Sequence, residues 1–218
     1  MRRERTTDMN DSSRPRRRIG ARAWTGALLA GCLAVLPPAA ADAASIRPAA
    51  LVEPASLLAL YDFSETSGTV LHDASAAQRD GTVVGGAAWR GGAMQFTGSN
   101  HVQLPNGLLA GKNAATIVIE TAPQALSGAK FLWNFGGSGD ASTGQFFIQP
   151  VAPRVAISKT NWSGEQSVTS ATKLVEGRSQ SVAATIEKNA NGTTSTLRLF
   201  IDGVQVAVKT DSTVNLAD

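Results

Sequence analysis

The sequence predicts an all-β protein that folds as an antiparallel sandwich or barrel. From Ser56 onward, short runs of β-branched and aromatic residues alternate with clusters of glycine, asparagine, aspartate and serine. This pattern is typical of strands joined by tight turns, and a helical spacing of apolar residues is hard to find. Apolar residues make up 43% of the 218 residues and charged residues only 17%. This composition excludes a disordered chain and supplies a core for one domain of ordinary size.

The expected strands follow one another at close spacing along this part of the chain. Each combines β-branched or aromatic residues with turn residues at its ends. Pro105–Ala110 is an exception, because its Pro-Asn-Gly opening predicts a turn with at most one helical turn. In chain order, the expected strands are Leu57–Phe63, Thr82–Val84, Ala93–Phe96, His101–Leu104, Thr116–Thr121, Lys130–Phe135, Gln145–Gln149, Arg154–Ser158, Gln166–Thr169, Ser181–Glu187, Ser195–Ile201 and Val204–Lys209.

The last two of these segments form the clearest hairpin in the sequence. Leu197, Leu199 and Ile201 recur at every second position, so the first of the two strands is expected to have one apolar face. Asp202 and Gly203 follow directly and suit a two-residue turn, in which both central residues need a positive φ angle. The sequence therefore predicts an antiparallel pair with a tight turn at Asp202-Gly203.

The positive charge of the chain is concentrated at its N-terminus. The formal net charge is +3, but residues 1–43 hold eight arginines and four acidic residues, which leaves residues 44–218 at −1. A basic start, an apolar run from Trp24 to Leu36 and an Ala-x-Ala end at Ala41–Ala43 are typical of a secretory signal peptide. We expect residues 1–43 to be removed on export to the outside of the cell, and residues 44–56 to form a linker. A nucleic-acid partner is not expected, because the basic residues leave with the signal.

Cys32 offers an alternative end to this signal. Leu29-Ala30-Gly31-Cys32 resembles the lipobox of bacterial lipoproteins, in which the cysteine is acylated. The apolar run continues beyond Cys32 to Leu36, whereas a lipoprotein usually becomes polar there. Simple cleavage and secretion are therefore favoured, and anchoring at a membrane is expected only if Cys32 carries lipid.

Four motifs of the mature chain, taken in order, resemble one family. They are Leu58–Gly68, the turn of Asp73–Val83, the Gly-Ala-x-x-Phe-x-Gly-Ser segment that opens Gly92–Pro105, and the Leu-x-x-Asp-Gly hairpin that opens Leu199–Ala207. Together they resemble the laminin-G-like domains of the concanavalin A-like lectin/glucanase superfamily. The resemblance extends from about Leu57 to Ala217. It implies an antiparallel jelly-roll β-sandwich over residues 57–218.

The chain departs from this family at two places. Ile117–Thr121 stands where the family usually has a Trp-Val-Lys ending. Family members also continue past the equivalent of Leu216 with a closing strand that pairs near the first one. We therefore expect a domain that lacks its last strands and leaves Leu57–Phe63 with an unpaired edge. A truncated reading, a fragment of a longer chain and a domain completed by another chain all account for this ending.

The residues do not predict an enzyme. A glycoside hydrolase needs two carboxylates beside the scissile bond, and on a strand these usually stand two residues apart. Glu120 and Glu187 each stand alone at the end of a predicted strand. His72 and His101 are isolated, and no Gly-x-Ser-x-Gly elbow accompanies them. One cysteine and two histidines supply neither a disulfide framework nor a Cys/His zinc site.

Calcium is the one cofactor that the sequence leaves open. Asp73, Ser75, Asp80 and Asn100 carry oxygen atoms in predicted turns, and many jelly-roll lectins hold a calcium ion that shapes the sugar site. Calcium needs about six to eight oxygen ligands, however, and the sequence contains no dense acidic loop. Hydrogen bonding within turns explains these four residues equally well.

Trp162 is the best candidate for a binding residue. It lies in a polar loop where no core face needs it, whereas Trp89 lies in a packing segment and Trp133 in an apolar strand. An exposed tryptophan in a loop often marks a binding surface. The predicted carbohydrate-binding cluster is Trp162 with Asn161, Glu165 and Gln166. Packing of Trp162 back onto the sandwich is the competing interpretation.

The resemblance and this cluster together predict a secreted, non-catalytic, lectin-like module. Its expected partner is an extracellular or cell-wall polysaccharide. Two alternatives stay open: an adhesion or protein-interaction domain at the cell surface, and a detached accessory module of a glycoside hydrolase.

Overall fold

The structure of the protein is a computed structural model that describes residues 55–128, 130–136 and 144–218. The predicted export signal, its cleavage site and Cys32 lie outside the described residues. Over the residues that are described, the regular structure is entirely β, with eleven strands in three antiparallel sheets. Within the same residues, no helix has the length and apolar character that a membrane span requires.

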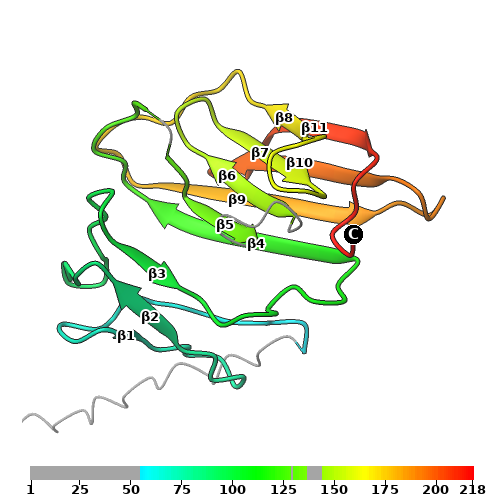
Figure 1. Cartoon of the computed structure of the whole chain (residues 1–218). Helices are drawn as coiled ribbons and strands as arrows, with labels where there is room; N and C mark the ends of the chain where they lie inside the picture. The colour runs from blue at the N-terminus through cyan, green and yellow to red at the C-terminus, as the bar shows by residue number, and fades with distance from the viewer. Residues whose placement is uncertain (1–54, 129, 137–143) are drawn as a thin grey trace, which may run out of the picture. The chain divides into compact units, whose positions relative to one another are not determined.

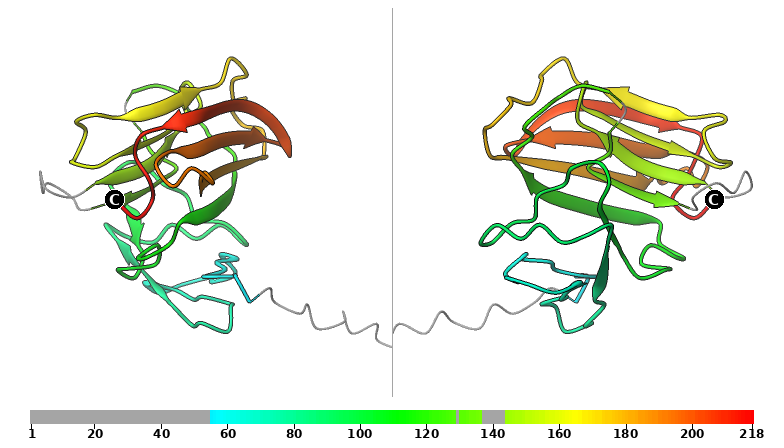
Figure 2. Two further views of the ribbon diagram at one scale, coloured as in Figure 1. Left: turned by 90° about the vertical axis from the view of Figure 1, so that its right-hand side faces the viewer. Right: turned by 60° about the vertical axis from the view of Figure 1, so that its left-hand side comes forward.

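Two four-stranded sheets pack face to face and form a β-sandwich (Figures 1 and 2). The first has the order β11-β10-β9-β4, and the second has the order β5-β6-β7-β8. The strands of the first sheet are β4 (Ala114–Thr121), β9 (Gln180–Lys188), β10 (Ser195–Ile201) and β11 (Val204–Ser212). Those of the second are β5 (Trp133–Gly136), β6 (Gln145–Gln149), β7 (Arg154–Ser158) and β8 (Gln166–Thr169).

The core lies between these two sheets and is filled by alternate residues of the central strands. In β9 and β10, every second side chain is buried, because successive side chains of a strand point to opposite faces. The facing residues of β6 and β7 complete the layer. The buried cluster consists of Phe146, Ile148, Val155, Ile157, Leu174, Val182, Ala184, Ile186, Leu197, Leu199, Ile201 and Val214.

The hairpin between β10 and β11 confirms the prediction from its sequence. Asp202 has a φ angle of 50° and Gly203 one of 76°, so both turn residues are in the left-handed region. Asp202 also holds the neighbouring strand, because its carboxylate accepts a hydrogen bond from the Ser181 amide at 3.0 Å and one from Arg178 at 2.9 Å. Leu197, Leu199 and Ile201 all face the core, as their spacing predicts.

A separate three-stranded sheet contains β1 (Val70–Leu71), β2 (Gly81–Val84) and β3 (His101–Gln103) in that order. The sequence did not indicate β1, which is only two residues long. Two predicted strands before and within this region are wrong. Leu57–Phe63 and Ala93–Phe96 form no strand, and the second contributes only one isolated bridge, between Trp89 and Met94.

Local hydrogen bonds and turns explain both errors. In the first segment, the Leu60 amide donates to the Asp73 side chain at 2.8 Å. The partner of this amide is therefore a carboxylate and not the backbone of a neighbouring strand. Phe63 then has a φ angle of 55°, which ends any extended run. Before the second segment, Gly91 and Gly92 both have positive φ angles and turn the chain.

Most other strand boundaries agree closely with the sequence. Strands β6, β7, β8 and β10 have the expected ends. Strand β5 begins at Trp133, three residues later than expected, and β11 continues to Ser212, three residues further. Pro105–Ala110 contains turns and no strand, as its composition predicts.

Leu199→Ala tests the position of the core. Leu199 is fully buried between the sheets, so removal of its side chain is expected to lower the free energy of unfolding by about 2–5 kcal/mol. Val204→Ala, at an exposed position of the neighbouring strand, is the control and should change it by less than about 0.5 kcal/mol. Urea denaturation followed by circular dichroism measures both. Equal effects of the two substitutions would contradict this core.

Candidate functional site

The outer face of the sheet β5-β6-β7-β8 carries the candidate site. The register places Phe147 of β6 opposite Asn134 and Ala156, in a row that faces away from the core. The neighbouring row contains Ile148 and Val155, which belong to the core cluster. Although Phe147 is on the outer face, only 1% of its surface is exposed. Other parts of the chain must therefore cover it.

Two aromatic side chains cover Phe147. The ring of Trp162 lies 5.4 Å from the ring of Phe147 at an angle of 75°, and the ring of Phe131 lies 5.3 Å away at 89°. Trp162 and Phe131 are stacked on each other, with centroids 5.9 Å apart and planes only 16° from parallel. Such edge-to-face and stacked contacts are the preferred geometries of aromatic pairs. Trp162 is nevertheless 49% exposed, so its indole is fixed underneath and open to solvent.

The turn between β7 and β8 places Trp162 on this face. Thr160 and Ser163 form an isolated bridge, with a hydrogen bond of 2.9 Å from the Ser163 amide to the Thr160 carbonyl. Asn161 has a φ angle of 44°, in the left-handed region that asparagine tolerates better than most residues. Its carbonyl accepts a hydrogen bond from the Ser158 hydroxyl. Asn161 therefore shapes the loop through its backbone.

Arg154 forms the polar side of the site. Its guanidinium group lies over the ring of Phe147, with the central carbon 5.2 Å from the ring centroid. The same group donates to the Glu165 carboxylate, with which it forms an ion pair, and to the Gln149 amide oxygen at 2.9 Å. Arg154 and Glu165 are only about one quarter exposed. A group of charged and amide side chains is therefore held beside the aromatic cluster.

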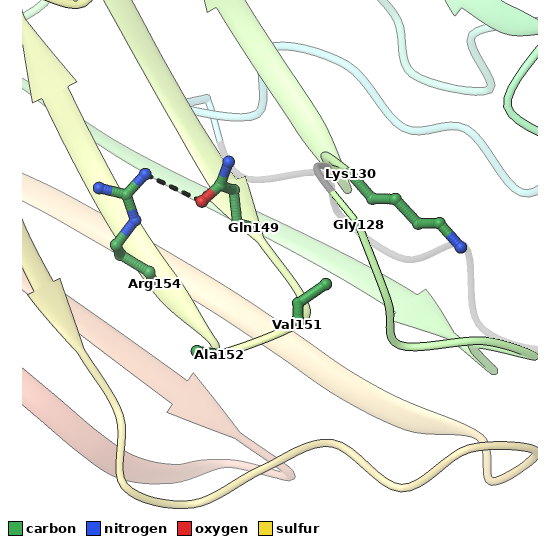
Figure 3. A pocket seen from close by; sticks show the side chains of 6 residues that line it. All are labelled: Gly128, Lys130, Gln149, Val151, Ala152 and Arg154. Atoms are coloured by element: carbon green, nitrogen blue, oxygen red, sulfur yellow. Dashed lines mark hydrogen bonds between the residues drawn. The ribbon is translucent and has the colours of Figure 1, made fainter.

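A small open depression adjoins this polar side (Figure 3). Its volume is about 290 Å³, and it lies between the segment at Gly128 and the turn from β6 to β7. Figure 3 shows Arg154 and Gln149 joined by their hydrogen bond, whereas the side chain of Lys130 extends away from them. The ammonium group of Lys130 donates to the Ala125 carbonyl at 3.1 Å. The polar lining therefore includes one bound guanidinium and one amide, and the depression has the size of a small ligand subsite. Its lining residues are Gly128, Lys130, Gln149, Val151, Ala152 and Arg154.

The structure brings only part of the predicted cluster together. Trp162 and Glu165 meet at Arg154 and Phe147. Gln166 pairs with Ile157 of the core, so its side chain starts on the opposite face of the sheet. The site residues that the sequence did not indicate are Phe131, Phe147, Gln149 and Arg154.

The other two described tryptophans lie away from this site. Trp89 is partly buried, and its indole N–H donates to the Gly68 carbonyl at 3.0 Å. Trp133 packs against the core on the inner face, with its ring 4.9 Å from that of Phe146. Trp162 is the one described tryptophan that is exposed.

The oxygen atoms considered for calcium are bound to the protein itself. Asp73 accepts hydrogen bonds from the amides of Leu60, Ser75 and Arg79 at 2.8–2.9 Å. Asp80 accepts from the Asp73 amide at 2.9 Å, and the Asn100 side-chain oxygen accepts from the Thr97 amide at 2.8 Å. These contacts have the geometry of turn-stabilising side chains. Among the described residues, no three acidic, histidine or cysteine side chains converge for a metal ion.

Comparisons with known proteins assign the chain to no family. The chain matches no family model, no curated protein and no solved structure. The site is therefore interpreted from its contacts alone.

The buried carboxylate of Asp73 makes the region around β1 and β2 sensitive to acid. Its burial raises the pKa, but the amides of Leu60 and Arg79, together with Ser75, stabilise the charged form more strongly and hold the pKa at about 2. Since this value is below the ordinary value of 3.8, the carboxylate stabilises the folded state above about pH 4. That contribution is lost as the pH falls from about 4 to 2.

Asp73→Asn tests this interaction. At pH 7 the substitution is expected to lower the stability of this region by about 1–3 kcal/mol, because it places an amide N–H₂ group against backbone donors. The difference from the unsubstituted protein should shrink between pH 4 and pH 2. Hydrogen exchange of the Leu60 and Arg79 amides measures it, with Glu187→Gln, at an exposed carboxylate, as the control. A difference that does not change with pH would disprove this role of Asp73.

Proposed function

We propose that this protein is a secreted, non-catalytic module that binds extracellular or cell-wall polysaccharide at the site around Trp162. One observation carries the proposal: the indole of Trp162 is fixed against Phe131 and Phe147, yet half of its surface stays open. In the competing interpretation, Trp162 only packs back onto the sandwich. That packing accounts for the covered face of the indole but not for its exposed face. The open side is the surface that we assign to a ligand.

The chemistry of this surface suits a sugar ring. A pyranose has a flat face of C–H groups and a rim of hydroxyl groups, so it needs an apolar plate with polar groups at its edge. The indole supplies the plate. Arg154, Glu165 and Gln149 supply N–H donors and oxygen acceptors beside it. Such a combination of aromatic walls and a few placed polar groups is the usual composition of a small-molecule site.

The site is also ordered before a ligand arrives. Stacking on Phe131 restricts the Trp162 ring, and the pairing of Arg154 with Glu165 and Gln149 restricts the polar groups. Binding therefore costs little conformational entropy at these side chains. A shallow, preorganised surface suits a long polymer, which can continue past the site in both directions.

The carboxylates around Trp162 support binding without hydrolysis. Cleavage of a glycosidic bond needs two carboxyl groups about 5 to 10 Å apart, one on each side of the bond. Among the described residues that we assign to the site, Glu165 is the one acid, and its carboxylate is paired with Arg154.

We also include the finer fold and the export of the chain in this proposal. The laminin-G-like jelly roll is supported by the turn around Asp73, by the bridge from Trp89 to Met94 and by the hairpin at Asp202. These features lie in three of the motifs that carry the resemblance. Secretion by cleavage near Ala43 is supported by the basic and apolar residues that precede it.

Trp162→Ala tests the proposed function. The unsubstituted protein is expected to bind at least one polysaccharide in a panel of soluble and insoluble cell-wall glycans. The substitution should weaken that binding at least about tenfold, which corresponds to about 1.4 kcal/mol. Affinity electrophoresis in gels that contain each polysaccharide measures the effect, and pull-down assays extend it to insoluble glycans.

Phe96→Ala is the matched control, because Phe96 is an equally exposed aromatic residue, at 50%, outside the sandwich sheets. It should leave binding unchanged. Binding that survives Trp162→Ala would contradict the site, and so would equal loss in both variants. Failure of the unsubstituted protein to bind any glycan would contradict the function.

A further inference from the structure

The sequence contains two Asn-Gly pairs, Asn106-Gly107 and Asn191-Gly192, and both lie at exposed turns. In such a pair, the backbone nitrogen of the glycine can attack the side-chain carbonyl carbon of the asparagine. Glycine permits this attack more readily than other residues, because it has no side chain and adopts a wider range of backbone angles. The attack needs a free asparagine side chain and a free glycine N–H group, so the contacts of these two groups decide where it occurs.

Hydrogen bonds hold both reacting groups of the second pair. Asn191 lies in the turn between β9 and β10, where its side-chain oxygen accepts from the amides of Thr193 and Thr194, each at 3.0 Å. Its side-chain nitrogen donates to the Thr194 hydroxyl at 2.9 Å. The Gly192 amide donates to the Asn189 carbonyl, also at 2.9 Å. Attack at Asn191 therefore requires this turn to open first.

The first pair has no such contacts. Asn106 and Gly107 lie in the turns that lead from β3 to β4, and Gly107 has a φ angle of 77°. Over the residues that the structure describes, neither the Asn106 side chain nor the Gly107 amide forms a hydrogen bond. The next residue, Leu108, is buried, so this segment is anchored while its Asn-Gly tip stays open to solvent.

We propose that Asn106 is a site of spontaneous deamidation in the folded protein, and that Asn191 is protected from the same reaction. The Gly107 nitrogen loses its proton to solvent and forms a bond to the side-chain carbonyl carbon of Asn106. The bond from this carbon to the side-chain nitrogen breaks, and ammonia leaves with a proton from the solvent. The product is a cyclic imide. Water then opens the imide at one of its two carbonyl carbons, which yields either aspartate or isoaspartate. Water is the one co-reactant, and no group is oxidised or reduced.

The reaction adds a carboxylate to a polar surface. Asn106 lines an open depression of about 310 Å³ between β2, β3 and the segment after β3, together with Asp80, Thr82, Gln103, Leu104 and Pro105. Asp80 is the one acid among these residues, and either product places a second carboxylate beside it. The formal charge of residues 44–218 changes by one unit, from −1 to −2. Isoaspartate also lengthens the backbone of the turn, because the chain then continues through the former side chain.

Incubation of the full chain in neutral and mildly alkaline buffer, followed by trypsin digestion and mass spectrometry, tests this proposal. Trypsin releases the two pairs in separate peptides, 91–112 and 189–198. The first peptide should gain the mass that replacement of –NH₂ by –OH adds. This change should be at least about tenfold faster than in the second peptide, because Asn191 reacts only after its turn opens. The rate should rise with pH, since the attacking nitrogen must lose its proton. Fragmentation of the peptide assigns the change to Asn106.

Denaturation and substitution supply the controls. In guanidinium chloride, both pairs should react at similar rates, because the hydrogen bonds that protect Asn191 are then absent. Asn106→Gln should remove the mass change, because attack on the longer side chain closes a larger and less favourable ring. Its matched variant, Asn191→Gln, should leave the rate at Asn106 unchanged, and circular dichroism confirms that both variants are folded.

Equal rates at the two sites of the folded protein would overturn the proposal. A faster reaction at Asn191, or an Asn106 that reacts only in denaturant, would overturn it as well. The measurement involves no glycan, so its outcome is independent of the proposed function.

Discussion

The packing of β9 and β10 against β6 and β7 is the interaction on which the rest of the sandwich depends. Each of these strands places every second side chain between the sheets. Because the side chains of a strand alternate in direction, the same register that fills the core also decides which residues reach the outside. A shift of one residue in β6 would move Ile148 from the core face to the outer face and Phe147 from the outer face to the core face. The core and the candidate site therefore depend on the same register.

The candidate site is a second, smaller apolar cluster on the outer face. Phe147 is too large to leave exposed there, and the loop after β7 covers it with Trp162. The loop needs only a short turn to do so, since Asn161 accepts a left-handed conformation. The exposed half of the indole and the exposed part of Phe131 thus form the outer surface of a cluster whose other side, Phe147, is packed. Arg154 joins this cluster to polar groups without leaving its charge unpaired.

The sequence predicted those parts of the structure that depend on neighbours along the chain. Alternation located β6, β7, β8 and β10, and Asp202-Gly203 identified the hairpin. The polar surroundings of Trp162 indicated its exposure. Contacts between distant segments were not predictable in this way. The Leu60 amide bonds to a carboxylate 13 residues later, and Phe131, which precedes β5, meets a tryptophan from the loop between β7 and β8. Gln166 was assigned to the site from its proximity in sequence, although the pairing of β8 places it in the row that faces the core.

Strand β6 contributes Phe146 to the core and Phe147 to the floor beneath Trp162. Ligand binding at the proposed site would therefore be linked to folding through a single segment of backbone. A ligand that binds only the folded protein raises its stability by mass action, in proportion to the logarithm of the ratio of ligand concentration to Kd. Here the added free energy acts directly on a central strand of the sandwich. A polymer with many repeated units keeps the local ligand concentration high, so under the proposed function the protein would resist unfolding and proteolysis best when bound to its polysaccharide.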